Sequence, residues 1–273
     1  MAAPGPAAAA GWWAKVTLEY DGTRFAGSQY QPAQRTVQGV VEEALARLTG
    51  EWSRIALAGR TDAGVHASGQ VASCRVPVRF TPATLQRGLN ALLPEDVAAV
   101  EVRPVAAGFH ARFAALSRRY AYLIWNSPAP SPLRRATSWQ VRAPLEVAAM
   151  QAAARLLVGT HDFASFAGAG RGVPDDAGAT AGTRRTITAL TVAVAEQVES
   201  GRLVRIEVEA PSFLPQMVRN IAGALVAVGS GRWTVADLGG VLAAADRRRS
   251  APTAPPQGVI LLRVSYAPTW YDL

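Results

Sequence analysis

The chain has 273 residues, 49% of them hydrophobic, which suits one large domain or two domains of ordinary size. Its net charge is +8, and Lys15 is the only lysine, so arginine carries nearly all of the positive charge. Arginine binds phosphate oxygens with two parallel hydrogen bonds, which favours a nucleic-acid partner, although biased codon usage would also replace lysine by arginine. The single cysteine, Cys74, excludes an internal disulfide and a cysteine metal cluster, and it favours a reducing, cytoplasmic compartment.

Elements in the first half of the chain follow a recognisable order. An apolar alternation predicts a strand over 14–20, and a turn follows it. Thr36 is expected to cap a helix that ends at Gly50, and Thr81-Pro82 is expected to open a second helix. Shorter apolar runs predict strands over 55–58, 70–76 and 97–105. The resulting order is the split β-α-β-β-α-β arrangement.

The second half repeats the order of elements without a clear repeat of sequence. Strands are predicted over 120–125, 186–199, 203–209 and 259–266, and helices over 145–158, 215–228 and 235–245. A stretch rich in glycine, alanine and aspartate predicts a long loop over 167–185. No apolar run is long enough for a membrane span, so no membrane association is expected.

These patterns predict an α+β protein made of two split β-α-β-β-α-β units. We expect mainly antiparallel sheets, placed side by side, with a central cleft for a ligand. The predicted division is a disordered tail over 1–12, an N-terminal domain over 13–113 and a C-terminal domain over 114–273.

The most informative stretch is GRTDAGVHA at 59–67, which places a carboxylate, Asp62, between glycines directly after an apolar run. Burial would raise the pKa of this carboxylate and the nearby Arg60 would lower it, so an ionised form would persist in a pocket. Such a group is a candidate nucleophile or base. The alternative is an ordinary turn, because Asp-Ala-Gly is common in turns, and for an isolated motif this alternative is the stronger one.

Other segments change that balance. Motifs follow one another along the chain at 20–23, 36–39, 59–67, 109–113, 119–122 and 217–220. Through these motifs the chain, from about Trp13 onward, resembles the tRNA pseudouridine synthase A family, in which they follow the same order. The resemblance implies an isomerase that converts uridine to pseudouridine at positions 38–40 of the anticodon stem-loop of tRNA. It also implies a homodimer that uses no metal and no organic cofactor.

The resemblance assigns roles to individual residues. Asp62 matches the catalytic aspartate and is expected to be the nucleophile, Arg219 matches the arginine that pairs with it, and Arg60 matches the motif arginine beside it. Tyr120 matches the tyrosine that stacks on the target base. The chemistry suits these residues, because breaking a glycosidic bond puts positive character on the sugar, and a base in a stem must leave the helix to react. Without the resemblance, Tyr120 would suit a strand core and Arg219 a surface position on a helix.

His110 and Arg112 lie in the segment that matches the family's F-H-A-R motif, and we expect them to bind substrate. His66 is expected to bond backbone rather than to act as a general base, and the three histidines lack metal-ligand spacing. Two departures concern substrate positioning: Ser28 stands where the family usually has tryptophan, and Gln216 where histidine is common.

Two other functions fit parts of the sequence. The basic charge and the order of elements would also suit a non-catalytic RNA-binding protein. A lone carboxylate would suit a hydrolase acting on a nucleoside or glycoside, although a second carboxylate in the same loop is missing.

Overall fold

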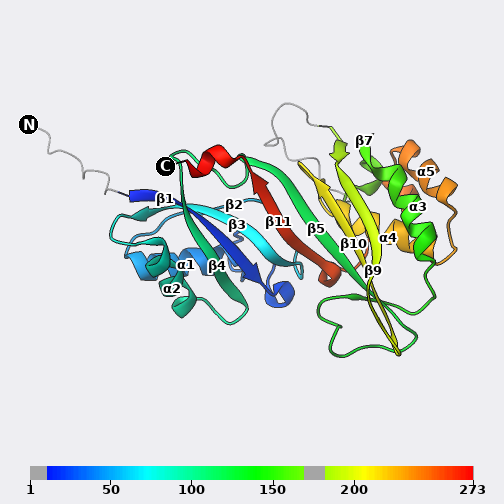
Figure 1. Cartoon of the computed structure of the whole chain (residues 1–273), viewed down its shortest axis with the longest axis horizontal. Coiled ribbons are helices and arrows are strands. Elements are labelled where there is room, and N and C mark those ends of the chain that lie inside the picture. Colours follow the sequence, from blue (N-terminus) through cyan, green and yellow to red (C-terminus); the bar gives the residue numbers. More distant parts are fainter. Residues whose placement is uncertain (1–10, 169–181, 273) are drawn as a thin grey trace, which may run out of the picture. The chain divides into compact units, whose positions relative to one another are not determined.

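A computed structural model describes residues 11–168 and 182–272, which form two compact units (Figure 1). The first unit holds the described residues up to Leu116 together with the chain from Val264 onward, and the second holds Ser117–Arg263. Residues 1–10 of the predicted tail and 169–181 of the predicted long loop lie outside the described residues, whereas Gly11 and Trp12 begin a strand.

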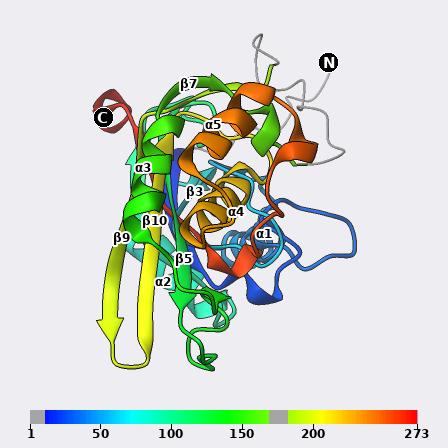
Figure 2. The same ribbon diagram turned by 90° about the vertical axis from the view of Figure 1, so that its right-hand side faces the viewer.

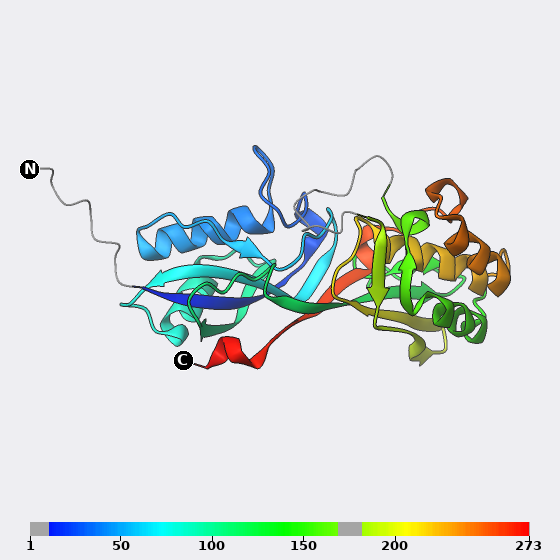
Figure 3. The same ribbon diagram turned by 90° about the horizontal axis from the view of Figure 1, so that it is seen from above.

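The first unit is one split β-α-β-β-α-β arrangement. Its strands lie in the order β4-β1-β3-β2, and all three of these pairings are antiparallel. Along the chain the elements are β1 (Gly11–Tyr20), α1 (Val37–Thr49), β2 (Ala56–Leu57), β3 (His66–Pro77), α2 (Pro82–Leu92) and β4 (Val97–Val105). Figure 3 shows α1 on one face of this sheet and the C-terminal turn η5 (Pro268–Tyr271) on the other.

Alternation along β1 explains why the sheet has a helix-covered face. Ala14, Val16 and Leu18 are buried, whereas the intervening side chains are less so. The two predicted helices have the predicted caps. The Thr36 side chain accepts a hydrogen bond from Gly39 N, and Gly50 ends α1 in the left-handed conformation that favours glycine.

The second unit repeats the arrangement with the strand order β11-β5-β10-β9. β10 pairs antiparallel with both of its neighbours, and the short β6 pairs parallel with β5. The elements are β5 (Ala115–Asn126), β6 (Trp139–Val141), α3 (Val147–Leu157), β9 (Ala189–Val198), β10 (Gly201–Ala210), α4 (Met217–Gly229), α5 (Val235–Ala244) and β11 (Val259–Tyr266). The first residues of β5 and the last of β11 belong to the first unit. Helix α3 packs on β9 and α4, and α5 packs on α3 (Figure 2).

The predicted α+β class, with split units and mainly antiparallel sheets, is confirmed. One predicted strand is wrong in its extent, because 186–199 is interrupted at Thr188. Its first part belongs to β8 (Arg184–Ile187), which pairs with the unpredicted β7 (Gly159–Asp162) in a separate two-stranded sheet. At the interruption Thr188 N donates to Glu209 O at 2.9 Å, so this backbone donor keeps a partner where the chain changes sheets.

Candidate active site

Asp62 lies in the first unit, in the loop between β2 and β3. Val65 N donates to Asp62 O at 3.2 Å, and Gly64 has a φ of 79°, so the residues after Asp62 form a tight turn that needs glycine. Asp62 itself is half-buried. The turn and the functional interpretation are therefore compatible, because the turn presents the carboxylate at the edge of a packed loop. Arg60, on the same loop, is exposed.

Buried side chains of β1 and β3 hold this loop. The hydroxyl of Tyr20 lies 2.8 Å from Thr61 Oγ1, directly before Asp62. Gln70 binds Gly59 twice, since its Nε2 donates to Gly59 O at 2.8 Å and its Oε1 accepts from Gly59 N at 3.3 Å. Burial raises the pKa of Tyr20, and its hydrogen bonds to Thr61 and Gln70 offset this only in part, so it stays neutral. Side chains from strands β1 and β3 thus hold the residues on the N-terminal side of Asp62 in place.

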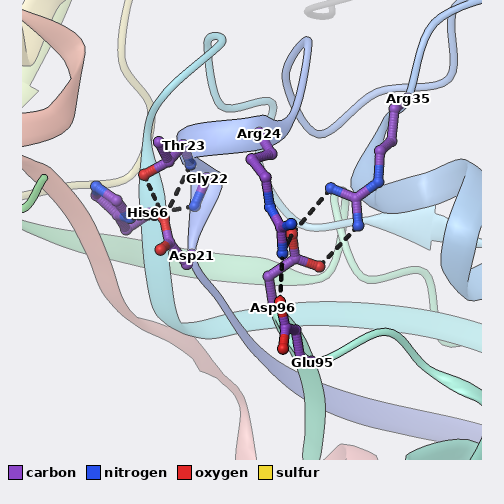
Figure 4. A network of polar contacts seen from close by, with 8 residues as sticks. All are labelled: Asp21, Gly22, Thr23, Arg24, Arg35, His66, Glu95 and Asp96. Atoms are coloured by element: carbon purple, nitrogen blue, oxygen red, sulfur yellow. Dashed lines mark hydrogen bonds and ion pairs between the residues drawn. The ribbon is translucent and has the colours of Figure 1, made fainter.

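His66, at the end of the motif, bonds backbone as predicted. Figure 4 shows its ring beside the turn at Asp21, and Gly22 N donates to its Nδ1 at 3.1 Å. The same nitrogen lies 3.2 Å from Asp21 Oδ1, so the ring contacts both the backbone and a side chain of this turn. Burial alone would raise the pKa of Asp21, but hydrogen bonds from Thr23 N and Oγ1 outweigh it and hold that pKa below its usual range. His66 therefore fixes the turn after β1.

A second polar cluster in Figure 4 was not predicted. The carboxylate of Asp96, which is 6% exposed, accepts two hydrogen bonds from Arg35, at 2.9 and 2.8 Å. Arg24 lies 3.2 Å from the same carboxylate and 2.8 Å from Glu95. The Arg35 hydrogen bonds hold the pKa of Asp96 below its usual range. Because Arg24 and Arg35 belong to the connection between β1 and α1, the cluster anchors that connection to the start of β4.

The segment with His110 and Arg112 is anchored through the residues between and before them. Phe109 is buried against the rings of Tyr266 and Trp270, with centroids 5.0 and 5.5 Å away. The hydroxyl of Tyr266 also donates to Ala111 O at 2.8 Å. Alternation then leaves His110 and Arg112 half-buried, at the surface of the first unit.

Phe113 was missed by the sequence reasoning. Its side chain is 68% exposed, its ring centroid lies 4.4 Å from that of His110, and the Arg112 guanidinium lies 5.5 Å from its ring. An exposed aromatic ring next to a histidine and an arginine is typical of a surface that stacks on nucleic-acid bases. The sequence could have indicated it, because Phe113 directly follows Arg112 in the F-H-A-R-F stretch at 109–113.

Tyr120 and Arg219 lie in the second unit. Tyr120, on β5, is 8% exposed, and its ring packs edge-to-face on Phe213 at 5.2 Å. Arg219 is half-buried in the first turn of α4, and its Nε donates to Ala254 O at 2.8 Å. Burial raises the pKa of the neighbouring Tyr122 well above its usual range, although the charge of Arg219 lowers it. Both residues are therefore held in place within their own unit.

Comparison with known proteins decides the family. The model of a family described as tRNA pseudouridine synthase matches residues 17–114 and 153–267. The chain belongs to this family. A tRNA pseudouridine synthase A of Chloroflexus aurantiacus is 50% identical over 253 residues, which is 93% of this chain and 88% of that protein. One of Myxococcus xanthus is 46% identical over 252 residues, which is 92% and 91% of the two chains.

Pseudouridine synthases are isomerases, so the predicted class of enzyme is confirmed. A solved structure titled "Crystal Structure of a Cbf5-Nop10-Gar1 Complex" is 14% identical, with a TM-score of 0.32. The match covers 78% of this chain and less than half, 45%, of that one.

Within 11–168 and 182–272, no cluster of three or more histidine, cysteine or acidic side chains is arranged to bind a metal ion. In the same described part of the chain, every helix is too short or too polar to cross a membrane.

Proposed function

We propose that this protein converts uridine to pseudouridine at positions 38–40 of the anticodon stem-loop of tRNA, with Asp62 as the nucleophile. Membership of the family and the names of the relatives support the reaction and the tRNA substrate. The observation that carries the choice of Asp62 is its place on a tight turn whose preceding residues are hydrogen-bonded to buried side chains of two strands. A carboxylate in a fixed position suits an attack on a sugar that gains positive character.

The other residues of the proposed site take the roles that the family implies. Arg219 is proposed as the cationic partner of Asp62, and Arg60 as the residue that fills the space left by the target nucleotide. Tyr120 is proposed to stack on the uracil. The ring contact of Tyr120 with Phe213 and the hydrogen bond from Arg219 to Ala254 O support fixed roles for both residues. A double-mutant cycle on Asp62 and Arg219, measured as the free energy of unfolding, tests their partnership, because interacting residues give non-additive losses.

His110 and Arg112 are proposed to bind the tRNA, with the ring of Phe113 as a stacking surface beside them. The net charge of +8 supports an anionic partner. We also propose a cytoplasmic homodimer that uses no metal and no organic cofactor.

Replacement of Asp62 tests the function. Asp62→Asn and Asp62→Ala are assayed with tRNA that carries 5-tritiated uridine, because C5 loses its hydrogen when it becomes the glycosidic carbon. We expect no release of tritium above background, together with nearly unchanged tRNA affinity, since contacts to phosphates supply most of the affinity. Asp272→Asn, which removes an exposed carboxylate, is the matched control and should keep full activity.

Several outcomes would reject the proposal. Activity of Asp62→Asn near the wild-type rate would exclude Asp62 as the nucleophile. Release of free uracil by the wild-type protein would indicate a hydrolase, and tRNA binding without pseudouridine would indicate a non-catalytic RNA-binding protein. Mapping of pseudouridine in the treated tRNA tests the positions.

A further inference from the structure

Ser28 is completely buried, with 0% of its surface exposed, in the connection between β1 and α1. Its hydroxyl oxygen accepts a hydrogen bond from Thr61 N at 2.8 Å, and its own N donates to Thr61 O at 3.0 Å. The two bonds hold the peptide groups on both sides of Thr61. The second of these peptide groups contains the nitrogen of Asp62. Ser28 therefore fixes the orientation of the peptide group that precedes the Cα atom of Asp62.

The segment that carries Ser28 is itself held by α1. Val37 N donates to Gly27 O at 3.3 Å, and Gln38 N donates to Ser28 O at 2.9 Å, so two of the free N–H groups at the start of the helix bind this segment. Gly27 has a φ of 108°, and a Cβ there would lie 2.9 Å from Thr61 O. Backbone packs directly on backbone at this point, which leaves Ser28 little freedom to move.

We propose that Ser28 is a positioning residue for the reaction: it acts through Thr61 to hold the carboxylate of Asp62 at the angle that the attack requires. The inference rests on the proposed role of Asp62 as the nucleophile. The short hydroxyl reaches Thr61 N directly, because the side chain of Ser28 lies against this backbone. Displacement of a reacting group by about 1 Å costs on the order of 100-fold in rate, so loss of this bond should affect the chemical step more than binding.

Single-turnover kinetics of Ser28→Ala test the proposal. We expect the rate of the chemical step to fall about 10- to 100-fold, while the Kd for tRNA stays within about twofold because phosphate contacts supply most of the affinity. Ser165→Ala is the matched control, since Ser165 is also 0% exposed and its hydroxyl also accepts from a backbone N–H, that of Asp246, at 2.9 Å. It should keep the wild-type rate even though it loses two hydrogen bonds, since its hydroxyl also donates to Val241 O at 2.6 Å.

Ser28→Cys guards against a folding defect, because the thiol has nearly the size of the hydroxyl but accepts hydrogen bonds weakly. Its rate should lie between those of wild type and Ser28→Ala, and it alone decides the question if Ser28→Ala does not fold. A wild-type single-turnover rate in the folded variants would overturn the proposal, as would an equal loss in Ser165→Ala or a loss confined to tRNA affinity. Asp62→Asn is measured in parallel: if it is active the proposed function fails, whereas an inactive Asp62→Asn with a fully active Ser28→Ala rejects only the role of Ser28.

Discussion

Removal of the buried carboxylate of Glu42 should destabilise the first unit strongly. Glu42 lies on α1 with 0% of its surface exposed. Its Oε1 accepts hydrogen bonds from Gln38 Nε2 at 2.8 Å and from Ile55 N at 3.0 Å, and its Oε2 lies 3.6 Å from Arg54 Nη1. In Glu42→Ala, Ile55 N loses its acceptor, and Gln38 Nε2 is left with only its longer bond to Ile55 O, at 3.4 Å.

The size of the loss follows from these contacts. A buried donor left without a partner costs about 1–3 kcal/mol, so the losses at Ile55 N and Gln38 Nε2 together cost at most about 2–6 kcal/mol. Relief of the desolvated charge opposes this, since a carboxylate oxygen that lacks a hydrogen bond is costly to bury. We therefore expect a decrease of about 2–4 kcal/mol in the free energy of unfolding. Glu42→Gln should cost less than this, because it keeps the acceptor at Oε1.

Urea unfolding at pH 7 measures the effect. Because the chain has two units, tryptophan fluorescence and circular dichroism are both recorded, and coincident transitions justify a single free energy. Glu43→Ala is the control, since Glu43 is the exposed neighbour on the same helix and should change the free energy of unfolding by less than about 0.5 kcal/mol. A loss below about 1 kcal/mol in Glu42→Ala, or an equal loss in Glu43→Ala, would refute the reasoning.

Two further changes test the surroundings of the site. Asp96→Asn should lower the free energy of unfolding by about 1–3 kcal/mol at pH 7. Because the Arg35 hydrogen bonds lower the pKa of Asp96 in the folded protein, this difference from wild type should be complete above about pH 4 and should shrink as the pH falls through the pKa of Asp96 in the folded state. Urea titrations at several pH values measure it. Phe113→Ala should weaken tRNA binding by about 1–3 kcal/mol with little change in stability. Leu133→Ala, which removes a 96% exposed side chain of the second unit, should leave tRNA binding unchanged. Filter binding at fixed salt measures both affinities, and an equal effect of the two substitutions would contradict a stacking role for Phe113.

The regular part of the fold could be predicted from local patterns. Thr36 and Gly50 mark the ends of α1 through caps that depend only on neighbouring residues, and the apolar alternation of β1 reports its buried face. The break at Thr188 could not be predicted in this way. The residues on both sides have strand character, and the break depends on a hydrogen bond to Glu209, which is distant in sequence.

The site was predictable where it depends on a turn and not where it depends on buried polar contacts. The glycine pattern around Asp62 predicts the turn, because only glycine adopts the conformation of Gly64 without strain. Gln38 and Glu42 follow helical spacing, but they are polar, so periodicity assigns them to the surface. Their burial depends on a contact that is distant in sequence, because Glu42 accepts a hydrogen bond from the backbone N–H of Ile55.

The same contacts explain how one helix supports, at two points, the chain that leads to Asp62. Before β2, Glu42 accepts a hydrogen bond from Ile55 N. Closer to Asp62, Gln38 N donates to Ser28 O, and Ser28 is hydrogen-bonded to Thr61. Gln38 joins the two paths, since its side chain donates to Glu42. The helix thus acts as a rigid support for the loop that carries Asp62, and a proposed nucleophile needs such a support to stay within a fraction of an ångström of its productive position. It follows that loss of Glu42 should act first on stability, whereas loss of Ser28, which is closest to Asp62 in this network, should act first on rate.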